Sequence, residues 1–324
     1  MCTAANYKTK DHYFGRTLDI DCCYGEVIAI TPRKFPFSFR KVENMNTHYA
    51  IIGVAKVLEN YPLYFDGTNE KGLSMAGLNF VNNAVYYGEQ SGMDNIAPFE
   101  LIPWVLGQCE SVDTARQLLE HTNLLDVSFN EKYPLAQLHW IISDSQSSIT
   151  VEALKDGMKI YDNPMGILTN NPPFDIQMFN LNNYMGLSTN NPQNHFCNKV
   201  NLDIYSGGMG ALGLPGDLSS MSRFIKASFT AYNSVSGEGE IESISQFFHI
   251  LGSVCQQKGC VKGETGEYVT TQYTSCCNTD RGVYYYTTYE NSQISAVDMN
   301  RENLDENQLI TYPIIDKQQI RFQN

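Results

Sequence analysis

The second residue of the chain carries the first chemical signal. Cys2 directly follows Met1, and an initiator methionine is normally removed before a small residue. Removal would place a thiol and a free α-amine on one residue. An ordinary α-amine has a pKa of about 7.7–8.0, so it can accept a thiol proton near neutral pH. Such a residue can act as nucleophile and base together, although many chains begin with Met-Cys by chance.

A β-hairpin is predicted directly after this cysteine. Thr3–Lys8 and Tyr13–Ile20 can pair about a two-residue turn at Lys10-Asp11. This pairing predicts that Cys2 lies opposite Asp19, whose carboxylate could then orient the α-ammonium group.

A basic residue lies close to that aspartate in the sequence. Arg16 precedes Asp19 by three positions, so the two side chains would face opposite sides of a regular strand. A bulge at Gly15 or a bend near Thr17 would bring Arg16 round to the same side. The alternative is a surface ion pair, which is worth little energy.

The rest of the chain reads as one continuous domain of strands and helices, without a linker or a repeat. Strands are expected at Thr3–Tyr7, His12–Asp19, Glu26–Thr31, Phe37–Val42, Ala50–Val57, Leu63–Phe65, Gly72–Phe80, Leu138–Ile142, Ser148–Ala153, Met158–Asp162, Gly166–Thr169, Val269–Cys276, Gly282–Tyr289 and Ile294–Asp298. Helices are expected at Pro98–Cys109, Val112–His121 (capped by Ser111), Phe174–Tyr184, Ser220–Tyr232 and Ile241–Gln256. Short turns between strands favour antiparallel sheets, and the element order favours sheets covered by helices.

Composition excludes several classes of protein. A net charge of -13 argues against a nucleic-acid binder, and 42% hydrophobic with 18% charged residues argues against a disordered chain. The start of the chain lacks the features of a signal peptide, and no apolar run is long enough for a membrane span. We therefore expect a cytoplasmic protein without membrane insertion.

The nine cysteines and six histidines show no spacing that is typical of a metal site, so no metal and no cofactor are expected. In a reducing compartment the cysteines should be free thiols, and those other than Cys2 are expected to be small buried hydrophobic residues. His139 is expected to be a core histidine with satisfied hydrogen bonds rather than a base.

Motifs along the whole chain resemble the choloylglycine hydrolases, which comprise bile salt hydrolases and penicillin V acylases within the N-terminal nucleophile hydrolases. The motifs are Met1-Cys2-Thr3, Phe14-Gly15-Arg16-Thr17-Leu18-Asp19, Asn69-Glu70-Lys71-Gly72-Leu73, Ala76-Gly77-Leu78-Asn79-Phe80, Leu138-His139-Trp140, Gly166-Ile167-Leu168-Thr169-Asn170-Asn171-Pro172, Gly213-Leu214-Pro215-Gly216-Asp217, Ser222-Arg223-Phe224, Gln272-Tyr273-Thr274-Ser275-Cys276 and Tyr284-Tyr285-Tyr286-Thr287-Thr288-Tyr289-Glu290-Asn291. They occur in order and at compatible spacing, and together they are highly specific.

The resemblance implies an α+β fold, a four-layer αββα sandwich of two antiparallel sheets between helical layers, in a single domain over 1–324. It also implies that Cys2, after removal of Met1, attacks an amide and forms a thioester. The remaining family catalytic positions are Arg16, Asp19, Asn79, Asn170 and Arg223.

Each of these positions has an expected role. Asp19 would hold the α-amine, Asn79 and Asn170 would donate to the oxyanion, and Arg16 and Arg223 would supply positive charge beside the thiol. From the residues alone, turns would be the preferred interpretation of both asparagines.

The resemblance further implies a substrate and an assembly. Conjugated bile salts would lie in an apolar groove lined by Leu18, Leu58, Phe65, Phe129 and Tyr133, and relatives are often tetramers built as dimers of dimers. Asn79 favours bile salts over penicillin V, since penicillin V acylases often have tyrosine at this position. Val81-Asn82-Asn83 replaces the Pro-Gly of many relatives. Penicillin V acylase and an inactive amphiphile-binding homologue stay open as alternatives.

Overall fold

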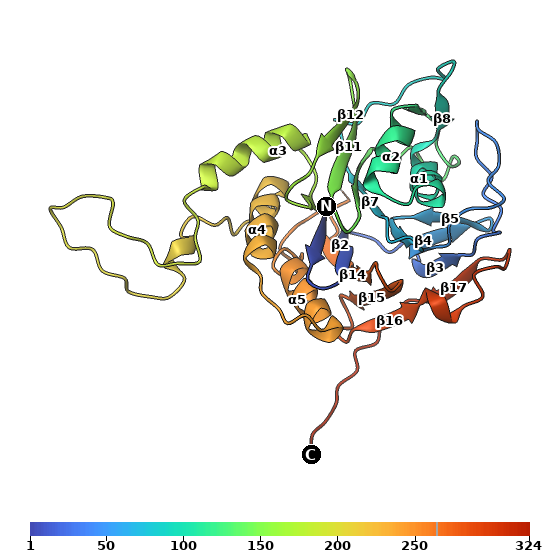
Figure 1. Cartoon of the computed structure of the whole chain (residues 1–324). Coiled ribbons are helices and arrows are strands. Elements are labelled where there is room, and N and C mark those ends of the chain that lie inside the picture. Colours follow the sequence, from blue (N-terminus) through green and yellow to red (C-terminus); the bar gives the residue numbers. More distant parts are fainter. Residues whose placement is uncertain (264) are drawn as a thin grey trace.

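Two antiparallel sheets lie face to face between helices (Figure 1), in a computed structural model that describes residues 1–263 and 265–324. Sheet A has six strands in the spatial order β13 (Ile167–Leu168), β1 (Cys2–Lys8), β2 (His12–Ile20), β14 (Thr270–Asn278), β15 (Val283–Thr288) and β16 (Ser295–Asp298). Sheet B has nine, in the order β12 (Gly157–Asp162), β11 (Ser148–Leu154), β10 (Leu138–Ser143), β7 (Ser74–Asn79), β6 (Asp66–Asn69), β4 (Ile51–Leu58), β3 (Val27–Thr31) and β17 (Ile310–Pro313), with β5 (Tyr61–Tyr64) beside β4.

The described residues contain five α-helices, and four of them form the outer layers. The helices are α1 (Leu101–Gln108), α2 (Val112–Leu119), α3 (Phe174–Asn180), α4 (Ser220–Asn233) and α5 (Glu240–Gly252). The first two pack on sheet B, and α4 and α5 pack on sheet A. The layer order implied by the family resemblance is therefore confirmed. A small parallel pair, β8 (Asp94–Ile96) and β9 (Thr122–Leu124), lies beside α2.

The burial of the strands follows from this layering. Central strands such as β4 and β7 are covered on both faces, so their residues form buried runs rather than an apolar and polar alternation. One apolar core fills the space between the sheets and under α4 and α5, and a second lies between sheet B and the pair α1 and α2. We call the face of sheet A toward sheet B its inner face, and the face toward α4 and α5 its outer face.

Most expected elements are present, and two expectations need correction. Ser111 caps α2 as predicted, since its Oγ accepts the N–H of Thr114. The strand predicted at Phe37–Val42 is absent apart from a single bridge between Phe37 and Met45. Helix α5 ends at Gly252 rather than at Gln256.

The segment between α3 and α4 projects away from the body of the molecule (Figure 1). It contains short 3-10 turns at Leu181–Tyr184 and Met209–Ala211, and others occur at Pro98–Glu100 and Met299–Arg301. Within the two described ranges, no helix has both the length and the apolar character that a bilayer crossing requires.

Candidate active site

Cys2 begins β1 and is only 2% exposed. It pairs with Leu18 and not with Asp19, so the hairpin register predicted from the sequence is wrong by one residue. The reason is the turn: Lys8 pairs with His12, which leaves a three-residue connection in place of the expected two-residue turn. A shift of one residue exchanges the two faces of a strand, so Cys2 shares a face with Arg16 rather than with Asp19. Because Arg16 reaches toward sheet B, this is the inner face of sheet A.

Arg16 lies on the same inner face without any bend in β2. Ala4 pairs with Arg16, two residues along from the Cys2 pair, so neither a bulge at Gly15 nor a bend near Thr17 is needed. Its Nη1 donates to the carbonyl oxygens of Phe65 (3.0 Å) and Gly77 (2.5 Å) in sheet B. Burial opposes the charge of this guanidinium, but negative charge at Cys2, Tyr273 and Asp66 raises the pKa of Arg16 above its ordinary value.

Gly15 has a packing role instead. A Cβ built on this glycine would lie 2.0 Å from the carbonyl oxygen of Ser275 in β14. No side chain fits there, so the glycine of the Phe14-Gly15-Arg16 motif allows β2 and β14 to approach.

Asp19 lies on the outer face, buried completely. Its carboxylate accepts hydrogen bonds from Thr17 Oγ1 (3.0 Å) and Thr271 Oγ1 (2.7 Å). Burial raises the pKa of Asp19, and the positive charge of Arg223 partly opposes this effect. The main chain of Asp19 also holds the start of the chain, since its N–H donates to Met1 O at 2.9 Å.

Asn170 and Arg223 hold the backbone of Cys2. Asn170 Oδ1 accepts the N–H of Cys2 at 2.8 Å. Arg223, from α4, donates to Cys2 O (2.6 Å), to Thr3 Oγ1 (2.6 Å) and to Asn170 Oδ1 (2.7 Å). Burial lowers the pKa of Arg223, and negative charge at Asp19 and Cys2 opposes that effect.

The two asparagines differ in what their side chains offer. Asn170 Nδ2 donates to Asn79 O at 2.8 Å, which links the ends of the two sheets. The side chain of Asn79, at the end of β7, is exposed. Asn79 therefore keeps an amide that can reach a substrate, while the Asn170 side chain is engaged on both its atoms.

A buried carboxylate below Arg16 was not foreseen from the sequence. Asp66, on β6, accepts hydrogen bonds from Tyr273 Oη (2.6 Å), Ser275 Oγ (3.3 Å) and Tyr284 Oη. Burial raises the pKa of Asp66, and the charge of Arg16 opposes the shift. Three donors and one guanidinium thus stabilise a carboxylate that is 1% exposed.

A β-bulge in β14 makes this arrangement possible. The pairing of β14 with β2 shifts between Thr271 and Tyr273, so Thr271 pairs with Asp19 while Tyr273 pairs with Leu18. Before the bulge, the side chain of Thr271 faces the outer side with Asp19. After it, Tyr273 and Ser275 face the inner side with Asp66. The bulge is therefore in β14, and not at Gly15 in β2.

The expected groove residues fall into two groups. Leu18 lies opposite Cys2, and Phe65 offers its carbonyl to Arg16 and stacks on Tyr24 at 6.0 Å. Leu58 pairs with Tyr61, whose ring lies 6.0 Å from that of Phe129. Tyr133 pairs with Asn130 in the loop that follows Phe129. Leu58, Phe65, Phe129 and Tyr133 are half-buried, as groove walls would be.

Other expected residues are settled by their burial. His139 is a satisfied core residue, as predicted: it is fully buried, with Nδ1 3.0 Å from Glu152 Oε1 and Nε2 3.0 Å from Thr169 O. The prediction that the remaining cysteines are buried holds for Cys109, Cys276 and Cys277. It is wrong for the exposed Cys22, Cys23 and Cys260, and Cys197 and Cys255 are half-buried.

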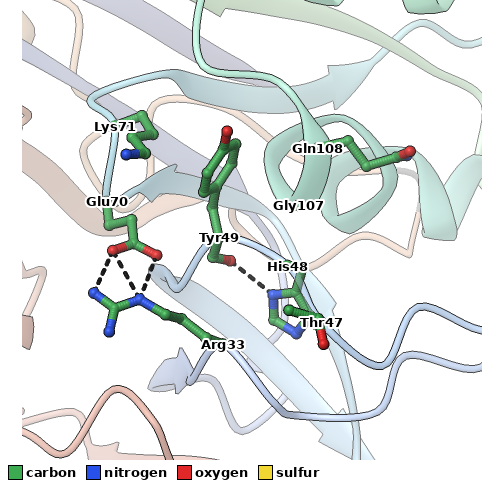
Figure 2. Close-up of a pocket in the computed structure, with 8 residues that line it drawn as sticks. All are labelled: Arg33, Thr47, His48, Tyr49, Glu70, Lys71, Gly107 and Gln108. Atoms are coloured by element: carbon green, nitrogen blue, oxygen red, sulfur yellow. Dashed lines mark hydrogen bonds and ion pairs between the residues drawn. The ribbon is translucent and has the colours of Figure 1, made fainter.

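A cavity of about 530 Å³ lies at a different place, lined by the segments that follow β3, precede β4 and follow β6, and by the end of α1 (Figure 2). Its wall contains the ion pair of Arg33 with Glu70, at 2.6 Å, and His48, whose Nδ1 hydrogen-bonds Tyr49 O. Glu70 also accepts the N–H of Ala50. These groups are engaged with one another, and none of them is an expected catalytic residue.

Comparison with known proteins places this geometry in a family. The family of linear amide C-N hydrolases, choloylglycine hydrolase family, matches residues 2–312. A bile salt hydrolase/transferase from Lactiplantibacillus plantarum is 56% identical over 314 residues, covering 97% of each chain. A second, from Clostridium perfringens, is 39% identical and covers 96% of each chain. The chain belongs to the choloylglycine hydrolase family.

Solved structures agree with this assignment. The chain matches a conjugated bile acid hydrolase from Clostridium perfringens, in its C2A mutant form, with a TM-score of 0.92, 38% identity and complete coverage of both chains. A penicillin V acylase from Agrobacterium tumefaciens matches with a TM-score of 0.77 and 20% identity, over 96% of this chain and 91% of that one. The latter likeness concerns the fold alone.

Proposed function

We propose that this protein hydrolyses the amide bond of glycine- or taurine-conjugated bile salts, with Cys2 as nucleophile after Met1 is removed. The observation that carries the proposal is the buried Cys2 held by Asn170 and Arg223, with Arg16 on the same face. The substrate class is supported by relatives named bile salt hydrolase/transferase that match nearly the whole chain.

The reaction would proceed in two halves. Cys2 Sγ attacks the amide carbonyl carbon, its proton passes to the α-amine, and the α-amine protonates the leaving nitrogen as the C–N bond breaks. This gives a thioester and free glycine or taurine. Water then attacks the thioester carbon and loses a proton to the α-amine, which returns it to Sγ as the bile acid leaves.

The structure supports specific roles for the groups around Cys2. Asn170 Oδ1 already accepts from the Cys2 nitrogen, so it would orient the α-amine. Asn79, with its exposed side chain, is the better placed of the two asparagines to donate to the oxyanion. Asp19 would act from the outer face through the charge of Arg223, and Arg16 would favour the thiolate.

The apolar groove residues would bind the steroid. Leu18 and Phe65 lie next to Cys2 and Arg16, and Leu58, Phe129 and Tyr133 would extend the apolar surface. Apolar burial and the local charge of Arg16 must offset repulsion between an anionic substrate and a protein of net charge -13.

A mass measurement combined with one substitution tests the mechanism. We expect the purified protein to lack Met1 and to release bile acid from glycocholate and taurocholate, and Cys2→Ala to abolish release. Cys260→Ala, at an exposed cysteine, is the matched control and should retain activity. Retention of Met1 in active protein, or full activity of Cys2→Ala, would disprove the mechanism.

The same assay separates the alternatives. Turnover of penicillin V without turnover of either bile salt would show that the substrate is wrong. Binding of bile salts without turnover of any substrate would show an inactive amphiphile-binding homologue.

We further propose a homotetramer, arranged as a dimer of dimers. The segment that projects between α3 and α4 exposes large apolar side chains, which favour contact with another copy. They include Met185 (81% exposed), Phe196 (86%) and Tyr205 (78%). Light scattering should give a tetramer for the wild type and a smaller species for Phe196→Ser combined with Tyr205→Ser. A monomeric wild type would refute this.

The proposed location is the cytoplasm. All nine cysteines are free, as expected in a reducing compartment. Fractionation of cells that produce the protein should recover its activity in the cytosol, and recovery in the medium or envelope would contradict the proposal.

A further inference from the structure

A second cavity lies on the outer face of sheet A, apart from the cavity of Figure 2. It is enclosed by the end of α5, the beginning of β14 and the end of β15, which lie together in Figure 1. Its volume is about 390 Å³, which is within the range of small-molecule sites. Asp19 lies on the same face of the sheet, and Thr271, its hydrogen-bond donor, is part of the cavity wall.

One wall residue has an unusual hydrogen-bond deficit. Gln256 is 0% exposed, and neither its Nε2 nor its Oε1 has a partner among the residues that the structure describes. Buried amides in folded proteins are almost always paired, because an unpaired one costs free energy. A ligand with one acceptor and one donor, seated in this cavity, would satisfy both atoms after a small movement of the side chain.

The chemistry of the wall selects the kind of ligand. Hydroxyl groups come from Ser245, Thr274, Thr287 and Ser292 besides Thr271, and Phe248 and Ile294 add apolar surface. No Lys, Arg, Asp or Glu occurs among the described lining residues, and the imidazole of His249 adds a group that can hydrogen-bond a hydroxyl. We propose that this cavity binds a neutral small molecule, about the size of a monosaccharide, that carries hydroxyl or amide groups.

Thr271 connects this cavity to the proposed catalytic machinery. Its Oγ1 donates to Asp19 Oδ1 at 2.7 Å and accepts the backbone N–H of Gln256 at 2.8 Å. Thr271 N–H in turn donates to Gln256 O at 3.2 Å. A ligand that hydrogen-bonds the Gln256 side chain therefore changes the hydrogen bonding of Asp19. Occupancy of the cavity then alters turnover at Cys2. This coupling, unlike the binding itself, rests on the proposed function.

Cys255 provides a local readout of binding that does not depend on activity. This half-buried thiol lines the cavity, whereas Cys260 is exposed and lies outside the wall. Mass spectrometry measures the rate at which iodoacetamide alkylates each thiol. Glucose and myo-inositol serve as neutral probes, and glucose 6-phosphate serves as the charged comparison. At a probe concentration ten times Kd, we expect Cys255 to react about tenfold more slowly, and Cys260 at an unchanged rate.

Other outcomes would overturn the binding proposal. Equal protection by glucose 6-phosphate would show that the site is not selective for neutral molecules. Equal slowing at Cys260 would show a non-specific effect of the probe, and no protection by either neutral probe would refute the stated ligand class.

Gly252→Leu adds an apolar side chain at the wall of the cavity. Gly252 lines the cavity at the end of α5, and a Cβ built on it meets nothing within 4 Å. The ratio of Cys255 alkylation rates with and without probe should fall to about one in this variant. Gly88→Leu, at another glycine with free space around it, is the matched control and should keep the wild-type ratio. Persistent protection in Gly252→Leu would place the probe elsewhere.

Gln256→Leu tests the unpaired amide. It should remove the protection while leaving the melting temperature unchanged or higher, because two unpaired polar atoms are lost. A lower melting temperature with protection retained would show that the amide has only a structural role.

Turnover of glycocholate tests the coupling separately. The neutral probe should change kcat in the wild type and not in Gly252→Leu. Protection of Cys255 without any change in kcat would leave the binding site standing and refute the coupling. If the protein turns over no bile salt, the proposed function fails while the alkylation result still decides the binding proposal.

Discussion

The two faces of β2 hold charge in different ways, although they belong to one strand. On the inner face, Arg16 lies above Asp66, a carboxylate fixed by two tyrosines and a serine and sealed between the sheets. On the outer face, Asp19 is held by two threonines and faces Arg223 from a helix. The inner charges are fixed by the packing of two sheets. The outer charges are held by side chains that can move with a helix or with a ligand in the cavity.

This difference suggests a division of roles. The inner face gives Cys2 a rigid electrostatic environment, since the hydrogen-bond partners of Arg16 and Asp66 are on strands, apart from Phe65, which joins β5 to β6. The outer face adjusts the backbone of Cys2 through Arg223 and Asn170. Substitutions on the inner face should therefore affect folding first, and substitutions on the outer face should affect turnover first.

Asp66→Asn is the strongest test of the inner face. Removal of this charge leaves the guanidinium of Arg16 buried without its carboxylate, which typically costs about 3–5 kcal/mol. We expect a loss of this size in the free energy of unfolding measured with urea. Asp305→Asn is the matched control, because its partner Arg33 is a surface residue, and it should cost at most about 1 kcal/mol. Equal effects of the two variants would refute the contrast.

Arg223→Lys tests the outer face through turnover. Lysine keeps the charge but cannot reach Cys2 O, Thr3 and Asn170 together, and loss of one charge-assisted hydrogen bond costs about 1.5–3 kcal/mol. We expect kcat for glycocholate to fall roughly 10- to 100-fold with little change in stability. Arg281→Lys, at an exposed ion pair, should keep the wild-type rate. A stability loss as large as that of Asp66→Asn would erase the distinction between the faces.

His12 extends the inner face to the far end of β2. Burial lowers the pKa of His12 from 6.5 to about 4, with Nδ1 next to Thr279 and Nε2 next to Ser143. Between pH 6.5 and 4, His12 binds a proton in the unfolded chain but not in the folded one. The contribution of His12 to stability is therefore complete above pH 6.5 and falls as the pH drops toward 4. Between pH 6.5 and 5 we expect His12 to contribute a loss of about 2 kcal/mol. Urea unfolding of the wild type and of His12→Gln at several pH values gives the free energy of unfolding, which should depend less steeply on pH in the variant. Equal slopes would contradict a neutral buried His12.

Thr271→Val should have the smallest effect of the four. It removes the hydrogen bond to Asp19, which is worth about 1 kcal/mol, and with it the acceptor of the Gln256 N–H. That bond lowers the pKa of Asp19 against the effect of burial, so its loss raises this pKa further. If the reaction needs the carboxylate, the acid limb of the pH–rate profile moves to higher pH. Thr287→Val, in the same cavity wall, should leave the limb in place. An unchanged acid limb of the pH–rate profile in both variants would show that turnover does not depend on the protonation state of Asp19.

Much of the fold was predictable from local patterns and from the family resemblance. The helices that contain Ser220 and Phe174 begin where the sequence indicated, and Ser111 caps its helix. The hairpin register failed because the Thr9–Asp11 segment lacks the glycine that identifies a turn type, and one extra turn residue exchanges the faces of the strand. The sequence therefore placed Arg16 and Asp19 near Cys2 correctly, but it exchanged the faces of the sheet on which their side chains lie.

The Asp66 cluster could not have been found in this way. Its members come from both sheets, and Tyr284 is 218 positions from Asp66 in the chain. Their convergence depends on the bulge at Gln272, and this residue carries no local signal for a bulge. The only sequence clue was the presence of Tyr273, Ser275 and Tyr284 in family motifs. The roles assigned to Cys2, Arg16, Asp19, Asn79, Asn170 and Arg223 stay predictions until the variants are assayed.

The central place of β14 in sheet A has a consequence for biosynthesis. Thr271 and Asp19 are bonded across 252 positions of the chain, so β2 lacks its neighbour until nearly the whole polypeptide has left the ribosome. Contacts of such long range form late and slowly. The N-terminus therefore stays accessible to an aminopeptidase during synthesis, so the proposed excision of Met1 would precede closure of the sheet. The proposed nucleophile would then be ready before the pocket exists, and the proposed catalytic centre would assemble as the chain is completed.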